Sequence, residues 1–278
     1  DLIKCDLLNK SKFENLLSDV ECIIHCAGYN NTSKSLSFKE EKKIWKNNYL
    51  VSKNLIKSAK NMNVKKFIFL SSSKVVKENS KQKINENINP SPQTEYAKSK
   101  LMSEKFILKY GNKNGIDVIC LRPTLVYGTG CKNFVNIIHN LTKINIMLNF
   151  NKINNLISLI HIEDLCEAII KVMISNKKKQ KTFLLSGPKN ISISEICFLI
   201  KNFSSKKLLK INLSCNFLLR INYILKKSKY ISFFVKITNL IDKVLASSYY
   251  TSDKFTKLYN WKPKIYPFNG FKKMIKNK

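Results

Sequence analysis

The segment KKFIFLSSS, residues 65–73, holds a short apolar run that ends in three serines. An apolar run of this length, bounded by polar residues, predicts a strand that is buried on both faces. Three further segments have the same form: DVECIIHCAG (19–28), GIDVICLRP (115–123) and KTFLLSG (181–187). Four such strands, spread along the chain, predict one central sheet.

Segments of mixed polarity separate these runs at residues 36–60, 96–110 and 162–173, and each is long enough to form a helix. Alternating strands and helices predict an α/β fold with a doubly wound parallel sheet and helices on both faces. Binding sites in such sheets form at the carboxyl ends of the strands. Those ends carry residues 25–28, 71–73 and 122–128, so we expect the chemistry there.

The pattern loosens after residue 185. The segment NISISEICFLIKNF (190–203) predicts a loop and a helix, and an apolar stretch interrupted by lysines follows at 221–245. TSDKFTKLYNWKP (251–263) predicts a short helix with Ser252 as its N-cap and Pro263 as its stop. We therefore expect a smaller, helix-rich unit beside the sheet.

The chain of 278 residues has a formal net charge of +32, and Arg122 and Arg220 are its two arginines. Its lysines are spread without interleaved aromatic clusters, which favours compositional drift of the surface over a nucleic-acid-binding patch. We therefore expect no nucleic-acid partner. The stretch at 221–245 has too many charges to cross a bilayer, which needs about 20 apolar residues, but peripheral membrane association stays open.

The eight cysteines show no CxxC spacing, and five of them lie within apolar runs, namely Cys5, Cys22, Cys26, Cys120 and Cys166. This pattern indicates small core residues in a reducing, cytoplasmic compartment rather than disulfides or zinc ligands. With three histidines in the chain, we expect no metal site.

The stretch TEYAKSK, residues 94–100, places Tyr96 and Lys100 four residues apart and so on one helix face. Tyrosine, with a pKa of about 10, needs a nearby cation to act as a base, and Lys100 could supply it. The spacing alone favours a solvated helix face over a catalytic pair, because tyrosine and lysine are both common in this chain. We expect Ser99 and Glu104 to be ordinary surface residues of the same helix. Ser72 and Arg122, each at a strand end, favour the proton-transfer interpretation.

The order of FIFLSSSKVV (67–76), TEYAKSK (94–100) and LRPTLVYGTG (121–130) resembles the extended short-chain dehydrogenase/reductase family, the NAD-dependent epimerases and dehydratases of nucleotide sugars. The resemblance implies a Rossmann-like fold, an NAD cofactor with NADP not excluded, a nucleotide-sugar substrate, and a homodimer through the helix that carries Tyr96. It implies Tyr96, Lys100 and Ser72 as catalytic residues, with the neighbouring Ser71 as the less favoured choice for the serine.

Further motifs extend the resemblance over most of the chain, including CDLLNKSKFENLLSDVECIIHCAG (5–28), KNNYLVSKNLIKSA (46–59) and LISLIHIEDLCEAI (156–169). The implied cofactor contacts are Asp6, Leu7, Cys26, Ala27, Gly28, Asn48, Tyr96, Lys100, Arg122 and Pro123, and the implied substrate contacts are Ser72 and Asn133. Simpler structural roles stay open for several positions: strand-end packing for His25, packing for His161, a local cap for Asp6, an ion pair for Arg122 and the core for Trp261.

The chain departs from the family pattern in its glycines. The family's cofactor loop, Gly-x-x-Gly-x-x-Gly, has no counterpart, because the first glycine is Gly28. We expect the leading βαβ unit to be absent, which leaves an incomplete NAD(P)-binding Rossmann-like domain at 1–128 and 159–185 and a substrate-binding domain at 129–158 and 186–278. Ile157 replaces an arginine that would contact the substrate diphosphate, and Lys143 or Lys152 could substitute for it.

The resemblance implies a nucleotide-sugar 4-epimerase that acts on a UDP-hexose or UDP-N-acetylhexosamine in surface-polysaccharide synthesis, and a polyprenyl diphosphate stays open as the carrier of the sugar. A 4-keto-sugar reductase or a dehydratase of the same family is the alternative. A third interpretation, of a different class, is a truncated, inert remnant or an interaction module.

Overall fold

The computed structural model describes residues 2–33, 36–76, 80–151, 153–177, 182–227 and 232–276. In this part of the chain, the central element is a parallel sheet with the strand order β1 (Cys22–His25), β2 (Lys66–Leu70), β4 (Asp117–Pro123) and β8 (Thr182–Leu185). Ile24 pairs with Ile68, which pairs in turn with Ile119. The four predicted strands and their parallel pairing are thus confirmed; Lys181 of the last predicted segment lies outside the described residues.

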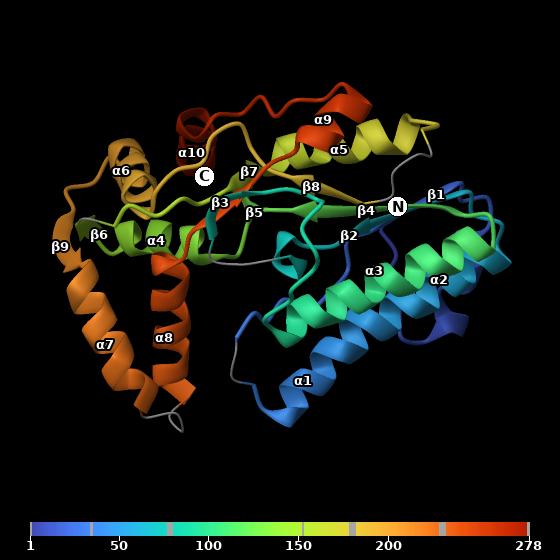
Figure 1. Cartoon of the computed structure of the whole chain (residues 1–278), viewed down its shortest axis with the longest axis horizontal. Coiled ribbons are helices and arrows are strands. Elements are labelled where there is room, and N and C mark those ends of the chain that lie inside the picture. The colour runs from blue at the N-terminus through green and yellow to red at the C-terminus, as the bar shows by residue number, and fades with distance from the viewer. Residues whose placement is uncertain are drawn as a thin grey trace.

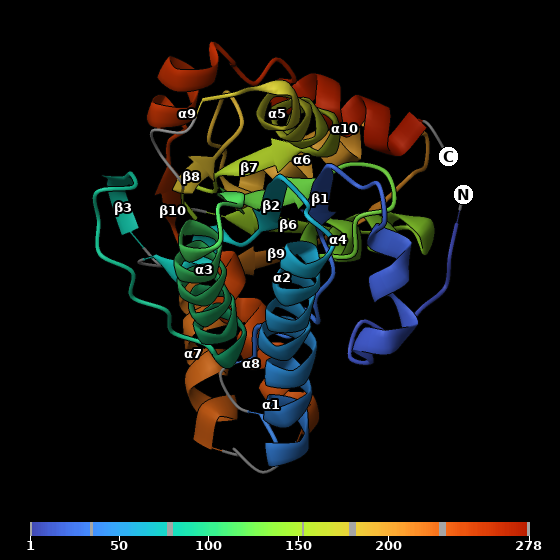
Figure 2. The ribbon, with the colours of Figure 1, turned by 90° about the vertical axis from the view of Figure 1, so that its right-hand side faces the viewer.

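Helices cover both faces of this sheet (Figures 1 and 2). One face carries α2 (Val51–Asn61) and α3 (Glu95–Lys113), and the other carries α5 (Ile162–Ile174). Side chains alternate accordingly: Phe67 and Phe69 pack in one cluster with residues of α2 and α3, and Ile68 packs in another with residues of α5. The predicted helices are confirmed, and the first of them divides into α1 (Phe38–Trp45), a π-helical turn (Lys46–Leu50) and α2.

A second group of elements lies beyond the carboxyl ends of the strands. The paired strands β5 (Leu125–Tyr127) and β7 (Leu159–His161) lead to it from the sheet. Its own elements are α4 (Phe134–Lys143), β6 (Ile146–Asn151), α6 (Ile193–Phe203), β9 (Leu209–Ser214), α7 (Cys215–Lys227), α8 (Ser232–Leu245) and α10 (Pro267–Lys276). Two short strands, β3 (Ser80–Ile84) and β10 (Ser248–Tyr250), also pair. The helix-rich unit is thus present, and it includes the parallel pair β6 and β9, which was not predicted.

Helix α9 (Asp253–Tyr259) packs on the sheet although its residues were expected in the substrate-binding domain. Its Phe255 and the following Trp261 join the core cluster of α5, β4 and β8, and their rings lie 5.2 Å apart. Trp261 is 1% exposed, which confirms it as a core residue. The hydroxyl of Ser252 does not cap α9 as predicted but accepts a hydrogen bond from the Ser186 amide (2.6 Å), and the helix ends before Pro263, at Tyr259.

Candidate active site

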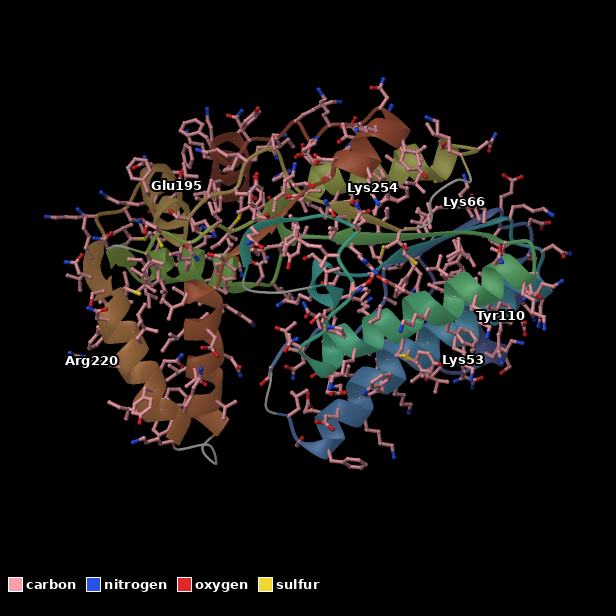
Figure 3. All side chains as sticks on the ribbon, in the orientation of Figure 1. Lys53, Lys66, Tyr110, Glu195, Arg220 and Lys254 are labelled. Carbon is pink, nitrogen blue, oxygen red and sulfur yellow. The ribbon has the colours of Figure 1, made fainter. Side chains whose placement is uncertain are left out.

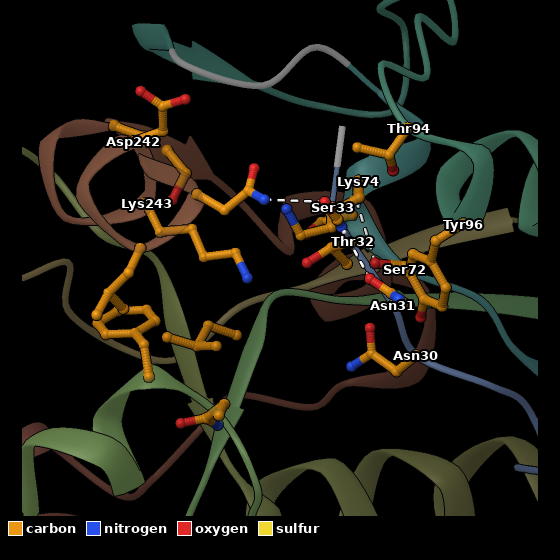
Figure 4. Close-up of a pocket in the computed structure, with 18 of the residues that line it drawn as sticks. Asn30, Asn31, Thr32, Ser33, Ser72, Lys74, Thr94, Tyr96, Asp242 and Lys243 are labelled. Atoms are coloured by element: carbon orange, nitrogen blue, oxygen red, sulfur yellow. Dashed lines mark hydrogen bonds between the residues drawn. The ribbon is translucent and has the colours of Figure 1, made fainter. Parts of the chain in front are cut away.

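Tyr96 lies in the first turn of α3, where its hydroxyl meets the side chain of Ser72. The helix begins there because the Thr94 hydroxyl accepts a hydrogen bond from the Ala97 amide (3.2 Å). Ser72 follows β2, and its Oγ also accepts from the Lys74 amide (3.2 Å). Figure 4 shows Ser72 and Tyr96 next to each other at the pocket. The structure therefore brings together two residues that lie 24 positions apart and that the sequence pattern had paired.

Lys100, one turn further along α3, is 4% exposed. Its Nζ donates to the Leu70 carbonyl (2.9 Å) and lies 4.7 Å from the centroid of the Phe69 ring. Burial lowers the pKa of Lys100 to about 8. The pKa of Tyr96 was expected to fall, but burial raises it, and the hydrogen bond from Ser72 offsets that rise in part.

Asn48 connects α3 to the loop that follows β1. Its Oδ1 accepts from the Tyr29 amide (2.7 Å), and its Nδ2 donates to the Tyr29 carbonyl (3.2 Å) and to Ser99 Oγ (3.0 Å). The Ser99 hydroxyl donates in turn to the Tyr96 carbonyl (2.8 Å). Ser99 is fully buried, so the prediction that it lies on the helix surface is wrong. Asn48 is a predicted cofactor contact, but its side-chain amide is hydrogen-bonded to protein groups.

His25 joins the same buried group from the end of β1. The Ser52 hydroxyl donates to the Asn48 carbonyl (2.6 Å), so it must accept from His25 Nε2, 2.9 Å away. Burial and the charge of Lys100 lower the pKa of His25 to about 3. His25 is therefore a neutral, packed strand-end residue, in agreement with the simpler interpretation.

The loop at residues 26–28 passes over Lys100. A Cβ on Gly28 would lie 3.0 Å from Asn48 Oδ1 and 3.2 Å from Lys100 Nζ, so the backbone approaches both side chains closely. Cys26 and Gly28 line the adjoining cleft. Cys26 and Cys166 are exposed, so their prediction as core residues is wrong, while Cys120 is buried as expected.

Arg122 forms a buried ion pair with Glu104. Nη2 and Nε of the arginine donate to the two carboxylate oxygens at 2.6 and 3.0 Å, and the side chains are 8% and 2% exposed. Glu104 is therefore not the surface residue that the sequence predicted. Arg122 has the structural role left open for it, and it does not line the cleft that Pro123 lines. An arginine within a buried strand needs an acidic partner, which is the signal that could have identified Glu104.

Asp6 and Leu7, the two predicted cofactor contacts near the amino terminus, also make local contacts. Asp6 Oδ1 accepts from the Leu8 amide (3.0 Å), which is the local cap considered as its simpler role. Leu7 packs against the cluster around Phe13. Neither residue lines the cleft, so their predicted cofactor contacts stay predictions.

A cleft of about 2020 Å³ opens between the carboxyl ends of the strands and α8. Ser72, Tyr96, Lys100, Pro123 and Asn133 all line it. The side chain of Asn133, however, caps α4 by accepting from the Val135 amide (3.0 Å) and donates to the Val126 carbonyl (2.6 Å). Its amide is thus committed to the protein, and its predicted substrate contact stays a prediction.

Two further buried hydroxyls line the cleft: Ser71, which was predicted as the less favoured alternative to Ser72, and Thr124, which was not predicted as a site residue. Ser71 Oγ and Thr124 Oγ1 have no hydrogen-bond partner among the described residues, and both line the cleft at the ends of neighbouring strands. A buried hydroxyl without a partner is costly unless a ligand or water satisfies it. Their positions at strand ends, directly beside Ser72 and Pro123, were the available signal.

The cations of the cleft also differ from those expected. Ile157 lines it, 5% exposed, where an arginine was expected. Of the two proposed substitutes, Lys143 is not among the lining residues and Lys152 lies outside the described residues. Lys132 and Lys243 line the cleft instead, and Figure 4 shows the amine of Lys243 directed into it.

A doubly covered parallel sheet with a serine and a Tyr-x-x-x-Lys helix at its carboxyl edge defines a Rossmann-like α/β protein of the short-chain dehydrogenase type. Residues 1–186 match the family described as NAD dependent epimerase/dehydratase, and the chain belongs to this family. The family indicated by the motifs is thereby confirmed.

Two comparisons add to this result. A UDP-glucose 4-epimerase of Vibrio cholerae is 29% identical over 194 residues, which cover 69% of this chain and 59% of that protein. The chain matches 45% or less of the length of three other curated relatives. The crystal structure of UDP-glucuronic acid 4-epimerase from Bacillus cereus, in complex with UDP-glucuronic acid and NAD, superposes with a TM-score of 0.77 at 20% identity, covering 98% of this chain and 79% of that one. This likeness confirms the fold.

Proposed function

We propose that this chain carries the proton-transfer and substrate-binding parts of an NAD-dependent nucleotide-sugar 4-epimerase. The observation that carries the proposal is the meeting of the Ser72 and Tyr96 hydroxyls at the cleft, with the buried ammonium of Lys100 one helical turn away. The family, the Vibrio cholerae epimerase and the Bacillus cereus epimerase structure support it.

The residues around Lys100 fit the ribose part of NAD. Leu70 O is the one hydrogen-bond acceptor of Lys100 Nζ among the described residues, so two of its three N–H donors remain for the hydroxyls of a ribose. Gly28 lets the backbone pass close to Lys100, since a Cβ there would lie 3.2 Å from the Lys100 ammonium. NAD, when bound, supplies the hydride acceptor. The chain has no glycine before Gly28, so these residues account for the ribose and nicotinamide side of the cofactor and not for its pyrophosphate.

Tyr96 is assigned the proton exchange with the sugar 4-hydroxyl, and Ser72 donates a hydrogen bond that stabilises the deprotonated oxygen. Burial keeps Tyr96 protonated at neutral pH, so it needs positive charge nearby to act as a base. Lys100 carries that charge below a pH of about 8, its own pKa. The proposed pair therefore works best at pH values at which Lys100 is still protonated.

The test is to incubate the purified chain with NAD and UDP-N-acetylglucosamine or UDP-glucose and to follow the 4-epimer of each by NMR. We expect interconversion that Tyr96→Phe reduces by a factor of about 10² to 10⁴, the usual contribution of a general acid or base. Tyr110→Phe is the matched control, because Tyr110 lies at the far end of the same helix, stacked on Phe106 (Figure 3). Equal activity of the wild type and Tyr96→Phe would refute the assignment.

The same incubation separates the alternatives. A 4-keto-sugar reductase would consume NAD(P)H in proportion to product, and a dehydratase would release a 4-keto sugar, whereas an epimerase does neither. A dehydratase stays a candidate because dTDP-D-glucose 4,6-dehydratase of Dictyostelium discoideum is 26% identical to this chain over 159 residues. An inert remnant would bind NAD too weakly to detect by calorimetry, and detectable binding by residues 1–278 would exclude it.

A further inference from the structure

Helix α7 presents an unusual combination of side chains to solvent. Phe217, Tyr223 and Ile224 are 49%, 65% and 62% exposed, and the exposed Arg220 and Lys227 lie among them. We call these five residues the outer face of α7. Positions 217, 220, 224 and 227 are three or four residues apart, so they stack along one side of the helix. The opposite side is occupied by Leu218, which packs in the core.

The charge of this face has one sign. The residues of α7 are CNFLLRINYILKK, without an acidic residue. The Lys227 ammonium lies 4.7 Å from the centroid of the Tyr223 ring, so cationic and aromatic groups share one surface. Figure 3 shows Arg220 on the side of α7 that points away from α8. An exposed helix that presents apolar, aromatic and basic side chains together, without an acidic one, has the composition of helices that lie in the interface of an anionic membrane.

We propose that the outer face of α7 binds the surface of an anionic lipid bilayer, with Phe217, Tyr223 and Ile224 in the interfacial layer and Arg220 and Lys227 at the lipid headgroups. No helix among the described residues is long and apolar enough to cross a membrane, so the contact is peripheral. Nucleic acid fits this face of α7 less well. Binding to nucleic acid is dominated by contacts to phosphates, and the aliphatic and aromatic side chains of the face would make none.

The position of the helix allows this contact while the cleft stays open. The α7–α8 hairpin projects from the body of the molecule, with α7 as its outer member (Figure 1). The cleft is lined by Asn222 and Lys226, which lie on the other side of α7, and by residues of α8. Phe233 in the first turn of α8 is a further exposed aromatic residue of the hairpin, at 62% exposure. The proposal does not depend on the catalytic assignment.

The experiment is co-sedimentation of the full chain with vesicles of phosphatidylcholine alone and of phosphatidylcholine and phosphatidylserine at a ratio of about 7 to 3. We expect binding to the anionic vesicles only, and an affinity at least tenfold lower for the double variant Phe217→Ser/Ile224→Ser. The matched control is Ile170→Ser/Ile174→Ser on α5, whose side chains are 51% and 67% exposed on another side of the molecule. It should bind like the wild type.

General attraction by the charge of +32 gives a different result, because all three proteins would then bind equally and release at high salt. That outcome, or no binding by the wild type, would overturn the proposal. Equal binding to both kinds of vesicle would also overturn it. As an independent measurement, the fluorescence emission of Phe217→Trp should shift to the blue when the protein binds anionic vesicles. If the protein co-sediments with the vesicles but its emission does not shift, the outer face of α7 is not the contact surface. Circular dichroism is the control that each variant is folded.

Discussion

The ion pair between Arg122 and Glu104 allows a quantitative prediction. Both side chains are buried, at 8% and 2% exposure, and the two hydrogen bonds measure 2.6 and 3.0 Å. In Glu104→Ala the guanidinium keeps its burial and loses its anion, and breaking a buried pair in this way costs about 3–5 kcal/mol. Because whole domains are stable by only about 5–15 kcal/mol, this single change should remove a large part of the free energy of unfolding.

The assay is urea unfolding followed by circular dichroism. With a slope of about 2–3 kcal/mol per molar urea, the midpoint of Glu104→Ala should fall by about 1 to 2.5 M. The double variant Arg122→Met/Glu104→Leu should recover most of the loss, because well-packed apolar residues often replace a buried pair without cost. Glu167→Ala is the matched control, since its pair with Lys264 is 33% and 70% exposed and should be worth about 1 kcal/mol or less.

Two results would refute this reasoning. One is a fall in the free energy of unfolding of less than about 1 kcal/mol for Glu104→Ala. It would mean that Glu104 does not compensate a desolvated charge on Arg122. The other is a double variant as unstable as the single one. If the double variant folds but loses calorimetric NAD binding that the wild type has, then Arg122 has a cofactor role beyond the ion pair.

Two further predictions follow from the buried polar group between β1 and α3. Folding lowers the pKa of His25 from its ordinary value of 6.5 to about 3. As the pH drops, the unfolded chain therefore binds a proton at His25 before the folded chain does. The contribution of His25 to the free energy of unfolding is fully present above pH 6.5 and falls below it. Between pH 7 and pH 5 the free energy of unfolding, measured by urea titration, should fall by about 2 kcal/mol on account of His25. His25→Gln should lack this part of the pH dependence. If the variant has the same pH profile of stability as the wild type, His25 is not the group responsible. Ser99→Ala should lower the free energy of unfolding by about 1–3 kcal/mol, because Asn48 loses a buried hydrogen bond and the Tyr96 carbonyl a partly buried one. A urea midpoint equal to that of the wild type would contradict this prediction.

The sequence predicted the sheet because the apolar runs around Ile24, Ile68 and Ile119 have no other low-energy place than between two layers of helices. It predicted the meeting of Ser72 and Tyr96 because serines at a strand end and a tyrosine on the next helix share one edge of a parallel sheet. Burial on α3 was not predictable from periodicity alone. This helix packs on the sheet and also on α2, so a second stripe that includes Ser99 is covered as well.

The stripe of Tyr96, Lys100 and Glu104 shows why α3 has to sit in one register. The three residues follow each other at intervals of four, so they lie on one side of the helix. Tyr96 reaches Ser72, Lys100 reaches the Leu70 carbonyl at the end of β2, and Glu104 reaches Arg122 on β4. A shift of α3 by one residue would turn this stripe by about 100° and would break the buried ion pair. The ion pair thus fixes the helix against the sheet, and through it the approach of the Tyr96 hydroxyl to Ser72.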